Sequence, residues 1–313
     1  MRYCIGIDLG GTNIAGGIAD LDGKLLLTDS IKTGLPCPAS DIADRIALLC
    51  RRMATALGLA LSDAAWVGIG APGSVDVDTG TVLYANNLEF DNVPLGQMIH
   101  ERTGLPVYVD NDANVAAWGE YCAGAGKGSS SMVMVTLGTG VGGGVIVNGK
   151  VIDGTHGAGG EIGHITVNRH ETAACGCGKH GCLEQYSSAT GVVRCMKKLL
   201  DENPDADCVL RGKDFEAKDV FDAARSGDAL AAREVDKMTD TLGMALASIA
   251  STTDPEMFLI GGGVARAGDV LFDPLVEHFK TYAFKSCRET PIKAASLGND
   301  AGIYGAVRLI VGE

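Results

Sequence analysis

Residues 3–13 read YCIGIDLGGTN, and this stretch decides the fold class. Its first part, Tyr3–Ile7, is a short apolar run typical of a buried strand. The run ends in Asp8-Leu9-Gly10-Gly11-Thr12-Asn13, and a second strand-like run, Ile14–Ala19, follows. Two glycines at the end of a strand let backbone N–H groups approach phosphate oxygens, because no Cβ intervenes. The stretch therefore predicts a strand–turn–strand unit that can hold a phosphate.

The side chains of this turn add polar groups. Thr12 and Asn13 supply further hydrogen-bond donors, and Asp8 can hold a Mg²⁺ ion directly or through water. The turn is not a Walker loop, since no Gly-Lys-Ser/Thr appears in it, and it is not a dinucleotide fingerprint, since an extended segment follows Gly10. The alternative is an ordinary glycine hairpin with a structural aspartate.

The same pattern recurs about 130 residues later, where residues 132–143 read MVMVTLGTGVGG. Here Gly138, Thr139 and Gly140 follow the strand. In both copies a third strand begins after a dipeptide that favours a hairpin turn, Asp22-Gly23 and Asn148-Gly149, because such turns need positive φ. The repeat predicts a duplicated domain in which two glycine hairpins hold one polyphosphate from both sides of a cleft.

Between and after these units, helical and extended patterns alternate, which favours an α/β fold. Helical spacing covers residues 41–57, 113–122, most of 190–252 with a break near Asn203-Pro204, and Ala301–Ile310; strand patterns cover 66–70, 106–109, 257–260 and the region of Ile292. We expect a small lobe of residues 1–111 plus 299–313, and a large lobe of residues 112–298 that carries a zinc-binding loop.

Asp112 follows a strand pattern and opens a helix, a position at which α/β sheets present ligands. Transfer of a phosphoryl group to a hydroxyl needs a base about 3 Å from that hydroxyl. Asp112 suits this role, and Asn111 can orient the acceptor by donating and accepting hydrogen bonds. Two alternatives stay open: Asp112 caps the helix, or Asp110 is the base.

Four side chains are expected to bind zinc: His164, Cys175, Cys177 and Cys182. Three thiolates and an imidazole form a closed tetrahedral Zn²⁺ set, and the intervening glycines let the chain turn tightly around an ion. With four protein ligands no position stays open for catalysis, so the zinc is expected to be structural. His180 as the fourth ligand, or three free thiols, are the alternatives.

Two glutamates flank the zinc motif. Glu161 precedes His164, and Glu184 follows Cys182 by two residues. Carboxylates held rigidly by a metal loop can accept hydrogen bonds from neighbouring sugar hydroxyls. Otherwise they are solvated surface glutamates.

A third glycine run, Gly261-Gly262-Gly263, follows a strand and precedes a helix. It lets an adenine or ribose lie against the backbone, or it is only a tight turn.

Composition excludes several classes of protein. The chain has 313 residues, of which 46% are hydrophobic, and this suffices for a large core. The net charge of −13 disfavours nucleic acid and anionic membranes as partners. The sequence shows no signal-peptide pattern and no apolar run of about 20 residues, so we expect a cytoplasmic protein. Most of its 10 cysteines are expected to be reduced.

Together these motifs resemble the ROK family of the sugar kinase/actin superfamily, from Ile5 to about Val307, and among its members the bacterial glucokinases. The short spacing from His164 to Cys175 is similar to that of glucokinases. Residues that match family motifs are Asp8, Gly10, Gly11 and Thr12; Gly138, Thr139 and Gly140; Gly261, Gly262 and Gly263; Asn111 and Asp112; Glu161 and His164; and Cys175, Cys177, Cys182 and Glu184.

The resemblance implies a duplicated actin-like (ribonuclease H-like) ATPase fold with two lobes around a central cleft. It implies that Asp112 is the base, that His164 both binds zinc and touches the sugar, and that Gly73 and Asn86 lie on the sugar side. The expected ligands are ATP, Mg²⁺, a structural Zn²⁺ and a sugar, and the expected assembly is a homodimer or homotetramer.

The resulting hypothesis is transfer of the γ-phosphate of ATP to the 6-hydroxyl of a hexose, with glucose as the first candidate. Alternative acceptors are N-acetylmannosamine, N-acetylglucosamine, fructose and allose. A second alternative is a sugar-responsive regulator without catalysis. Regulators of this family carry an added N-terminal DNA-binding domain, for which the position of Asp8 leaves no room, so we expect the enzyme.

Overall fold

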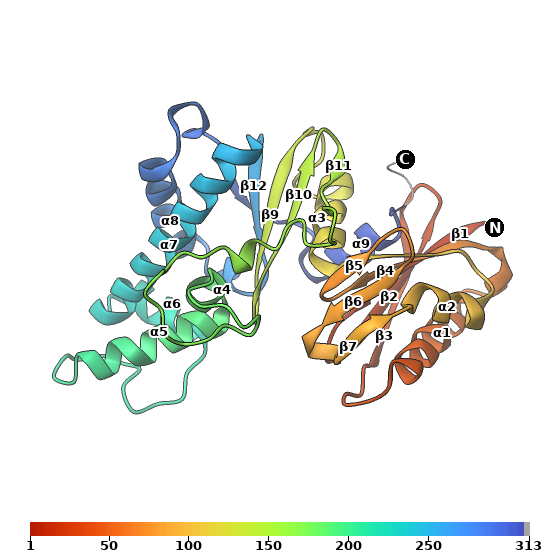
Figure 1. Cartoon of the computed structure of the whole chain (residues 1–313), viewed down its shortest axis with the longest axis horizontal. Helices are drawn as coiled ribbons and strands as arrows, with labels where there is room; N and C mark the ends of the chain where they lie inside the picture. Colours follow the sequence, from red (N-terminus) through yellow and green to blue (C-terminus); the bar gives the residue numbers. More distant parts are fainter. Residues whose placement is uncertain (310–313) are drawn as a thin grey trace. The chain divides into compact units, whose positions relative to one another are not determined.

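The computed structural model describes residues 1–309. Its chain forms two compact units, which we describe one at a time (Figure 1). The first unit contains residues 1–130, 144–160 and the chain from 296 onward, and the second contains residues 131–143 and 161–295.

A five-stranded sheet forms the centre of the first unit, in the order β3-β2-β1-β4-β8. The strands are β1 (Tyr3–Leu9), β2 (Asn13–Asp20), β3 (Leu25–Lys32), β4 (Ala64–Ala71) and β8 (Val107–Asn111). β1, β4 and β8 run parallel, whereas β1, β2 and β3 form an antiparallel meander. The carboxyl ends of β1 and β8 therefore lie at one edge of the sheet, where Asp8 and Asn111 are found.

The two faces of this sheet differ because large and small residues alternate along its central strands. The β-branched residues on one side of β1, such as Ile7, face α1 (Ala39–Ala56). On the opposite face, β1 and β4 carry glycines such as Gly6 and Gly68. A Cβ at Gly68 would lie 1.9 Å from the carbonyl oxygen of Ala306. Without side chains at these positions, α9 (Ala301–Ala306) can pack directly on the strands. Since side chains alternate along a strand, Asp8 lies on this same face.

A small antiparallel sheet, β5-β6-β7, completes the first unit together with α2 (Leu95–Thr103). Its strands are β5 (Ser74–Asp76), β6 (Thr81–Ala85) and β7 (Phe90–Val93), and a helical turn at Asn86–Leu88 joins the last two. Gly73 precedes β5 with a φ of 89°, and a Cβ there would lie 2.0 Å from the carbonyl oxygen of Tyr84. Only glycine fits this position.

In the second unit, β9 (Met132–Leu137), β12 (Met257–Gly261) and β13 (Ile292–Ala294) run parallel, with β12 between the other two. The helices that accompany them are α4 (Glu184–Ser187), α5 (Ala189–Glu202), α6 (Ala217–Arg225), α7 (Ala229–Thr253) and α8 (Asp269–Tyr282). α7 packs against both α5 and α8 (Figure 1).

β10 (Val141–Val147) begins in the second unit and continues into the first, where it pairs with β11 (Lys150–Val151). Asn148 and Gly149, with φ of 51° and 74°, form the predicted two-residue turn between these strands.

The α/β class predicted from the sequence is confirmed. The small sheet, α2 and the short α4 were not predicted. The outline of the units also differs from the expected lobes, since α3 (Asp112–Ala123) belongs to the first unit. Its Gly119 faces α9, because a Cβ there would lie 2.2 Å from the carbonyl oxygen of Ala301. The expected final helix ends at Ala306, and Ile310 lies outside the described residues.

A buried carboxylate of α3 adds to this attachment. Glu120 is fully buried and accepts hydrogen bonds from the backbone N–H groups of Ser296 (2.7 Å) and Leu297 (2.6 Å). It also accepts the N–H of Ala125 (2.8 Å) and the hydroxyl of Ser296 (3.0 Å). The chain is thus fastened to α3 where it returns from the second unit at residue 296.

Within residues 1–309, no helix has the length and apolar character needed to cross a bilayer.

Glu234 of α7 gives the fold a pH dependence that can be measured. Its side chain is buried, and this burial raises its pKa to about 7, against the lowering effect of Lys237 and Arg194. An unfolded chain ionises a glutamate near pH 4.3, so between that pH and 7 the folded state binds more protons. The unfolding free energy contributed by Glu234 therefore falls as the pH rises through this range.

Glu234→Gln removes this titration. We expect its stability relative to the wild type to increase by about 1–3 kcal/mol between pH 5 and pH 8, measured by urea unfolding at each pH. The exposed Glu277 provides the control, and Glu277→Gln should show no such trend. Parallel pH profiles for Glu234→Gln and the wild type would contradict the assignment.

Candidate active site

The first glycine turn joins β1 to β2 in the first unit. The N–H of Gly10 donates to the carbonyl oxygen of Asn13 (3.0 Å), and the hydroxyl of Thr33 donates to the carbonyl oxygen of Gly10 (2.6 Å). The N–H of Thr33 donates to the carbonyl oxygen of Thr12 (3.0 Å). Thr12 and Asn13 themselves are exposed. Hydrogen bonds from Thr33 thus fix the backbone of the turn, while Thr12 and Asn13 remain exposed to solvent.

Asp8 lies at the base of this turn. Desolvation by burial raises the pKa of its carboxyl to about 6, and the negative charge of Asp112 adds to the rise. The absence of a side chain at Gly302 of α9 makes space for this carboxyl group, because a Cβ there would lie 2.8 Å from the Asp8 carboxyl carbon. Two carboxylates whose charges repel each other can together bind a divalent cation.

At the start of α3, Asn111 is the N-cap. Its side-chain oxygen accepts the N–H groups of Ala113 (2.9 Å) and Asn114 (3.1 Å), and its Nδ2 donates to the carbonyl oxygen of Gly73 (2.9 Å). The alternative in which Asp112 caps the helix is therefore wrong. Asp112 is the first residue of α3, and its Oδ1 accepts the N–H of Ala113 (2.8 Å).

The Asn111 side chain has less hydrogen-bonding capacity for a sugar than expected. Its oxygen caps α3, and its Nδ2 donates to the carbonyl oxygen of Gly73. Its position nevertheless joins the Gly73 turn to the start of α3. Asn86, the other predicted sugar-side residue of this unit, is exposed and lies 3.4 Å from the Tyr84 hydroxyl through its Oδ1.

A buried polar cluster behind Asp112 was not predicted. Nδ2 of Asn114 donates to Asp110 (3.3 Å) and to Asp153 (3.1 Å), and Asp110 also accepts the N–H of Asn111 (2.6 Å). Burial raises the pKa of Asp110 to about 7, and the charge of Asp153 raises it further. A carboxyl that is 7% exposed and already engaged is poorly placed to meet a substrate. This argues against Asp110 as the base.

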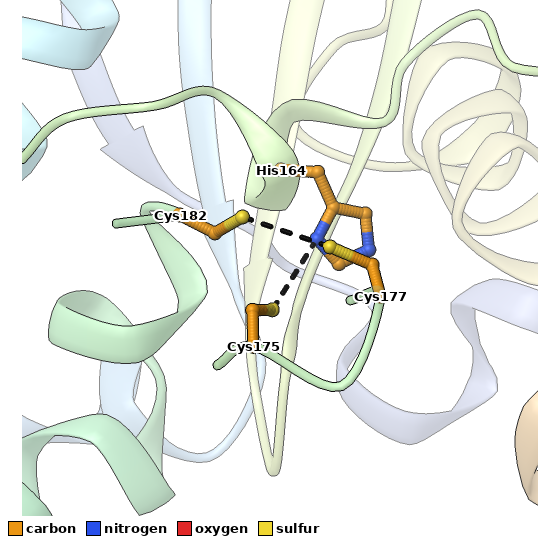
Figure 2. Close-up of side chains that lie close together, drawn as sticks. All are labelled: His164, Cys175, Cys177 and Cys182. Atoms are coloured by element: carbon orange, nitrogen blue, oxygen red, sulfur yellow. Dashed lines mark hydrogen bonds between the residues drawn. The ribbon is translucent and has the colours of Figure 1, made fainter. Parts of the chain in front are cut away.

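In the second unit, the four predicted zinc ligands lie together, with all four ligand atoms within 4.8 Å of one another (Figure 2). Nδ1 of His164 is 3.8 Å from the Cys175 sulfur, and the sulfurs of Cys177 and Cys182 are 3.7 Å apart. A tetrahedral ion with Zn–S distances near 2.3 Å separates its sulfurs by about 3.8 Å. The donor atoms and their spacing thus fit zinc. His180, the alternative fourth ligand, is exposed and lies outside the cluster.

Both glutamates that flank this cluster face it. Oε2 of Glu161 lies 3.8 Å from Nε2 of His164, the ring nitrogen that the cluster does not use. Oε1 of Glu184 lies 3.7 Å from the Cys175 sulfur, and its Oε2 accepts the N–H of Val141 (3.1 Å). Glu184 is therefore not a freely solvated surface residue.

The second and third glycine motifs meet in this unit because β9 and β12 are parallel neighbours. Gly261 pairs with Thr136 in the ladder. Gly262 follows with a φ of 83°, and a Cβ there would lie 2.4 Å from the carbonyl oxygen of Leu137, next to Gly138. The carboxyl ends of two parallel strands thus place two glycine turns side by side, an arrangement suited to a nucleotide.

Each unit therefore gathers its own part of the predicted site. The first unit holds Asp8, Gly10, Gly11, Thr12, Asn13, Gly73, Asn86, Asn111 and Asp112. The second holds Gly138, Thr139, Gly140, Glu161, His164, Cys175, Cys177, Cys182, Glu184, Gly261, Gly262 and Gly263.

Sequence reasoning missed Asn114 and Asp153. Asn114 stands two residues after Asp112, so its place in the motif was a usable signal, whereas nothing local marks Asp153.

Comparison with known proteins places the chain among sugar kinases. The protein-family model described as "ROK family" matches residues 4–313 of the sequence. A glucokinase of Halalkalibacterium halodurans is 40% identical over 99% of this chain and 95% of its own length. A glucokinase of Thermotoga maritima is 38% identical over 98% of this chain and 96% of its own.

One solved structure is similar to this chain in both sequence and fold. The ROK family glucokinase of Streptomyces griseus, in complex with glucose and AMPPNP, superposes with a TM-score of 0.81 at 39% identity. The match covers 98% of both chains.

Proposed function

Because the chain belongs to the ROK family, we propose that it is a glucokinase that transfers the γ-phosphate of ATP to the 6-hydroxyl of glucose. Full-length similarity to glucokinases supports the reaction and the acceptor. Similarity to a protein solved with glucose and AMPPNP supports the two ligands. The observation that carries the mechanism is the place of Asp112 at the first residue of α3, where Asn111 and not Asp112 caps the helix.

In this mechanism Asp112 accepts the proton of the 6-hydroxyl as the oxygen attacks the γ-phosphorus. The bond from that phosphorus to the β,γ-bridging oxygen breaks, and ADP leaves. In the two glycine turns, Gly10–Asn13 and Gly138–Gly140, the N–H groups of Gly11, Thr12, Thr139 and Gly140 stabilise the charge of the phosphates. The N–H groups of Gly10 and Gly138 donate within the turns themselves. Mg²⁺ supplies further charge neutralisation, and Asp8 is the residue that would hold it, directly or through water.

On the sugar side, Glu161 and Glu184 accept hydrogen bonds from the sugar hydroxyls, with Gly73, Asn86 and Asn111 as further neighbours of the sugar. His164, Cys175, Cys177 and Cys182 would hold the zinc. A closed set of four protein ligands supplies rigidity rather than chemistry, because it keeps the flanking glutamates in place.

Gly261, Gly262 and Gly263 are proposed to receive the adenosine. Family resemblance alone supports a homodimer or homotetramer, which light scattering distinguishes from a monomer. The cytoplasmic location also stays a prediction.

A panel of sugars tests the proposal. The purified protein is incubated with MgATP and glucose, N-acetylmannosamine, N-acetylglucosamine, fructose or allose, and ADP release is followed by a coupled assay. We expect kcat/KM for glucose to exceed that for each other sugar by at least about tenfold. The phosphorus spectrum of the product should identify the 6-phosphate.

Preference for another sugar in this panel would transfer the proposal to that sugar. Tight glucose binding without ADP release would instead support the non-catalytic regulator.

A further inference from the structure

The start of α4 and the start of α5 contact the second glycine turn at three points, all within the second unit. The N–H of Ala189 donates to the carbonyl oxygen of Gly138 (2.8 Å). The hydroxyl of Thr190 donates to the carbonyl oxygen of Thr139 (2.7 Å). The N–H of Val141 donates to Oε2 of Glu184 (3.1 Å). One short segment, residues 184–190, thus holds consecutive peptides of the turn proposed to bind phosphates.

These contacts determine where the N–H groups of the turn point. A trans peptide is planar, and its C=O and N–H point in opposite directions. With the carbonyl of Gly138 directed at Ala189, the N–H of Thr139 points away from α5. With the carbonyl of Thr139 directed at Thr190, the N–H of Gly140 does the same. Two successive N–H groups turned to one side form an anion-binding concavity.

The neighbouring Ser188 bears on the hydrogen bond from the Thr190 hydroxyl to the carbonyl oxygen of Thr139. Ser188 is fully buried and caps α5, since its Oγ accepts the N–H of Gly191 (2.9 Å) and donates to the carbonyl oxygen of Glu184 (2.7 Å). A hydroxyl has one hydrogen, so that of Ser188 is committed to Glu184. Oγ1 of Thr190 also lies 3.0 Å from Oγ of Ser188, but its one hydrogen goes to the closer acceptor, the carbonyl oxygen of Thr139 at 2.7 Å.

Glu184 links the same turn to the sugar side. Its Oε2 holds Val141, and a Cβ at Gly140 would lie 2.2 Å from that oxygen, so only glycine permits the contact. Its Oε1 faces Cys175 (3.7 Å). The helical turn that carries His164 also packs here, since a Cβ at Gly163 would lie 2.1 Å from the carbonyl oxygen of Val141. A ligand that orders Glu184 therefore orders the glycine turn.

From these contacts we propose that Thr190 is a positioning residue for the nucleotide phosphates, and that the segment 184–190 makes sugar binding strengthen nucleotide binding. The proposal rests on the proposed function, because it takes Glu184 as a sugar ligand and Gly138–Gly140 as a phosphate ligand. Thr190 itself contacts neither substrate. It acts through the carbonyl of Thr139, which fixes the N–H of Gly140.

Thr190→Val tests this inference, because valine keeps the shape of threonine and removes the hydroxyl. AMPPNP binding is measured by calorimetry with Mg²⁺, with and without saturating glucose, and glucose binding is measured alone. We expect Thr190→Val to raise the Kd of AMPPNP by about 3–10-fold in the presence of glucose. The gain in AMPPNP affinity that glucose produces should shrink by a similar factor. The Kd of glucose alone should stay within about twofold.

Thr190→Ser is the matched control, since it keeps the hydroxyl and should bind AMPPNP within about twofold of the wild type. Thr190→Ala replaces Thr190→Val if the latter does not fold. An unchanged AMPPNP affinity in a folded, zinc-loaded Thr190→Val would overturn the inference and leave the kinase proposal intact. Failure of the wild type to bind glucose or AMPPNP would overturn both.

Discussion

Asp112→Asn is expected to lower kcat by at least about a hundredfold while the Kd of glucose changes by less than about threefold. An amide has the shape of the carboxylate but does not accept a proton near neutral pH. The helix should survive the change, because Asn111 supplies the cap and the N–H of Ala113 keeps an oxygen to bind. Steady-state turnover with MgATP and calorimetric titration with glucose measure the two quantities.

Asp110→Asn is the matched control, since the sequence left Asp110 as an equal candidate for the base. Its carboxyl is buried against Asn114 and the N–H of Asn111, so its replacement should perturb position rather than remove a proton acceptor. We expect a loss of less than about tenfold. If Asp110→Asn loses the activity and Asp112→Asn keeps it, the base is Asp110.

Cys182→Ser is expected to release most of the zinc and to raise the KM of glucose by at least about tenfold. Serine does not ionise near neutral pH, so the ion would keep only His164, Cys175 and Cys177. The Cys182 side chain is fully buried, so bulk water reaches that ligand position poorly. Without the ion the loop that orients Glu184 loses its rigidity. Zinc content by mass spectrometry and steady-state kinetics give the two values.

Cys208→Ser serves as the control, because Cys208 is a partly buried thiol outside the cluster. It should retain one zinc per chain and the wild-type KM. Full zinc content in Cys182→Ser would remove Cys182 from the ligand set, and a zinc-free Cys182→Ser protein with an unchanged KM would end the idea that the metal supports sugar binding.

The cluster of His164, Cys175, Cys177 and Cys182 was predictable because its chemistry is local. Three of the four ligands fall within Cys175–Cys182, and glycine spacing leaves few other ways to arrange them. The glycine turns were predictable for the same reason. Which residue caps α3 was not, because Asn and Asp both favour the N-cap and helix starts are uncertain by a residue or two.

Other features depend on contacts between distant residues. Asp153 is joined to Asn114 across 39 positions, and no pattern near either residue shows the partner. The small sheet has strands of three to five residues, too short for alternation to stand out from loop sequence. The extent of the first unit was missed because α3 is held there by Gly119 and Glu120, whose partners near residues 296–301 are remote in sequence.

The discontinuous first unit has a consequence for synthesis on the ribosome. Its sheet is translated first, yet the glycine face of β1 and β4 is covered by α9, which follows about 230 residues after β4. At 5–20 residues per second, that face waits roughly 10–50 s for its helix. During this interval the nascent chain exposes an apolar strand surface, so this protein should depend on chaperones that bind early in translation.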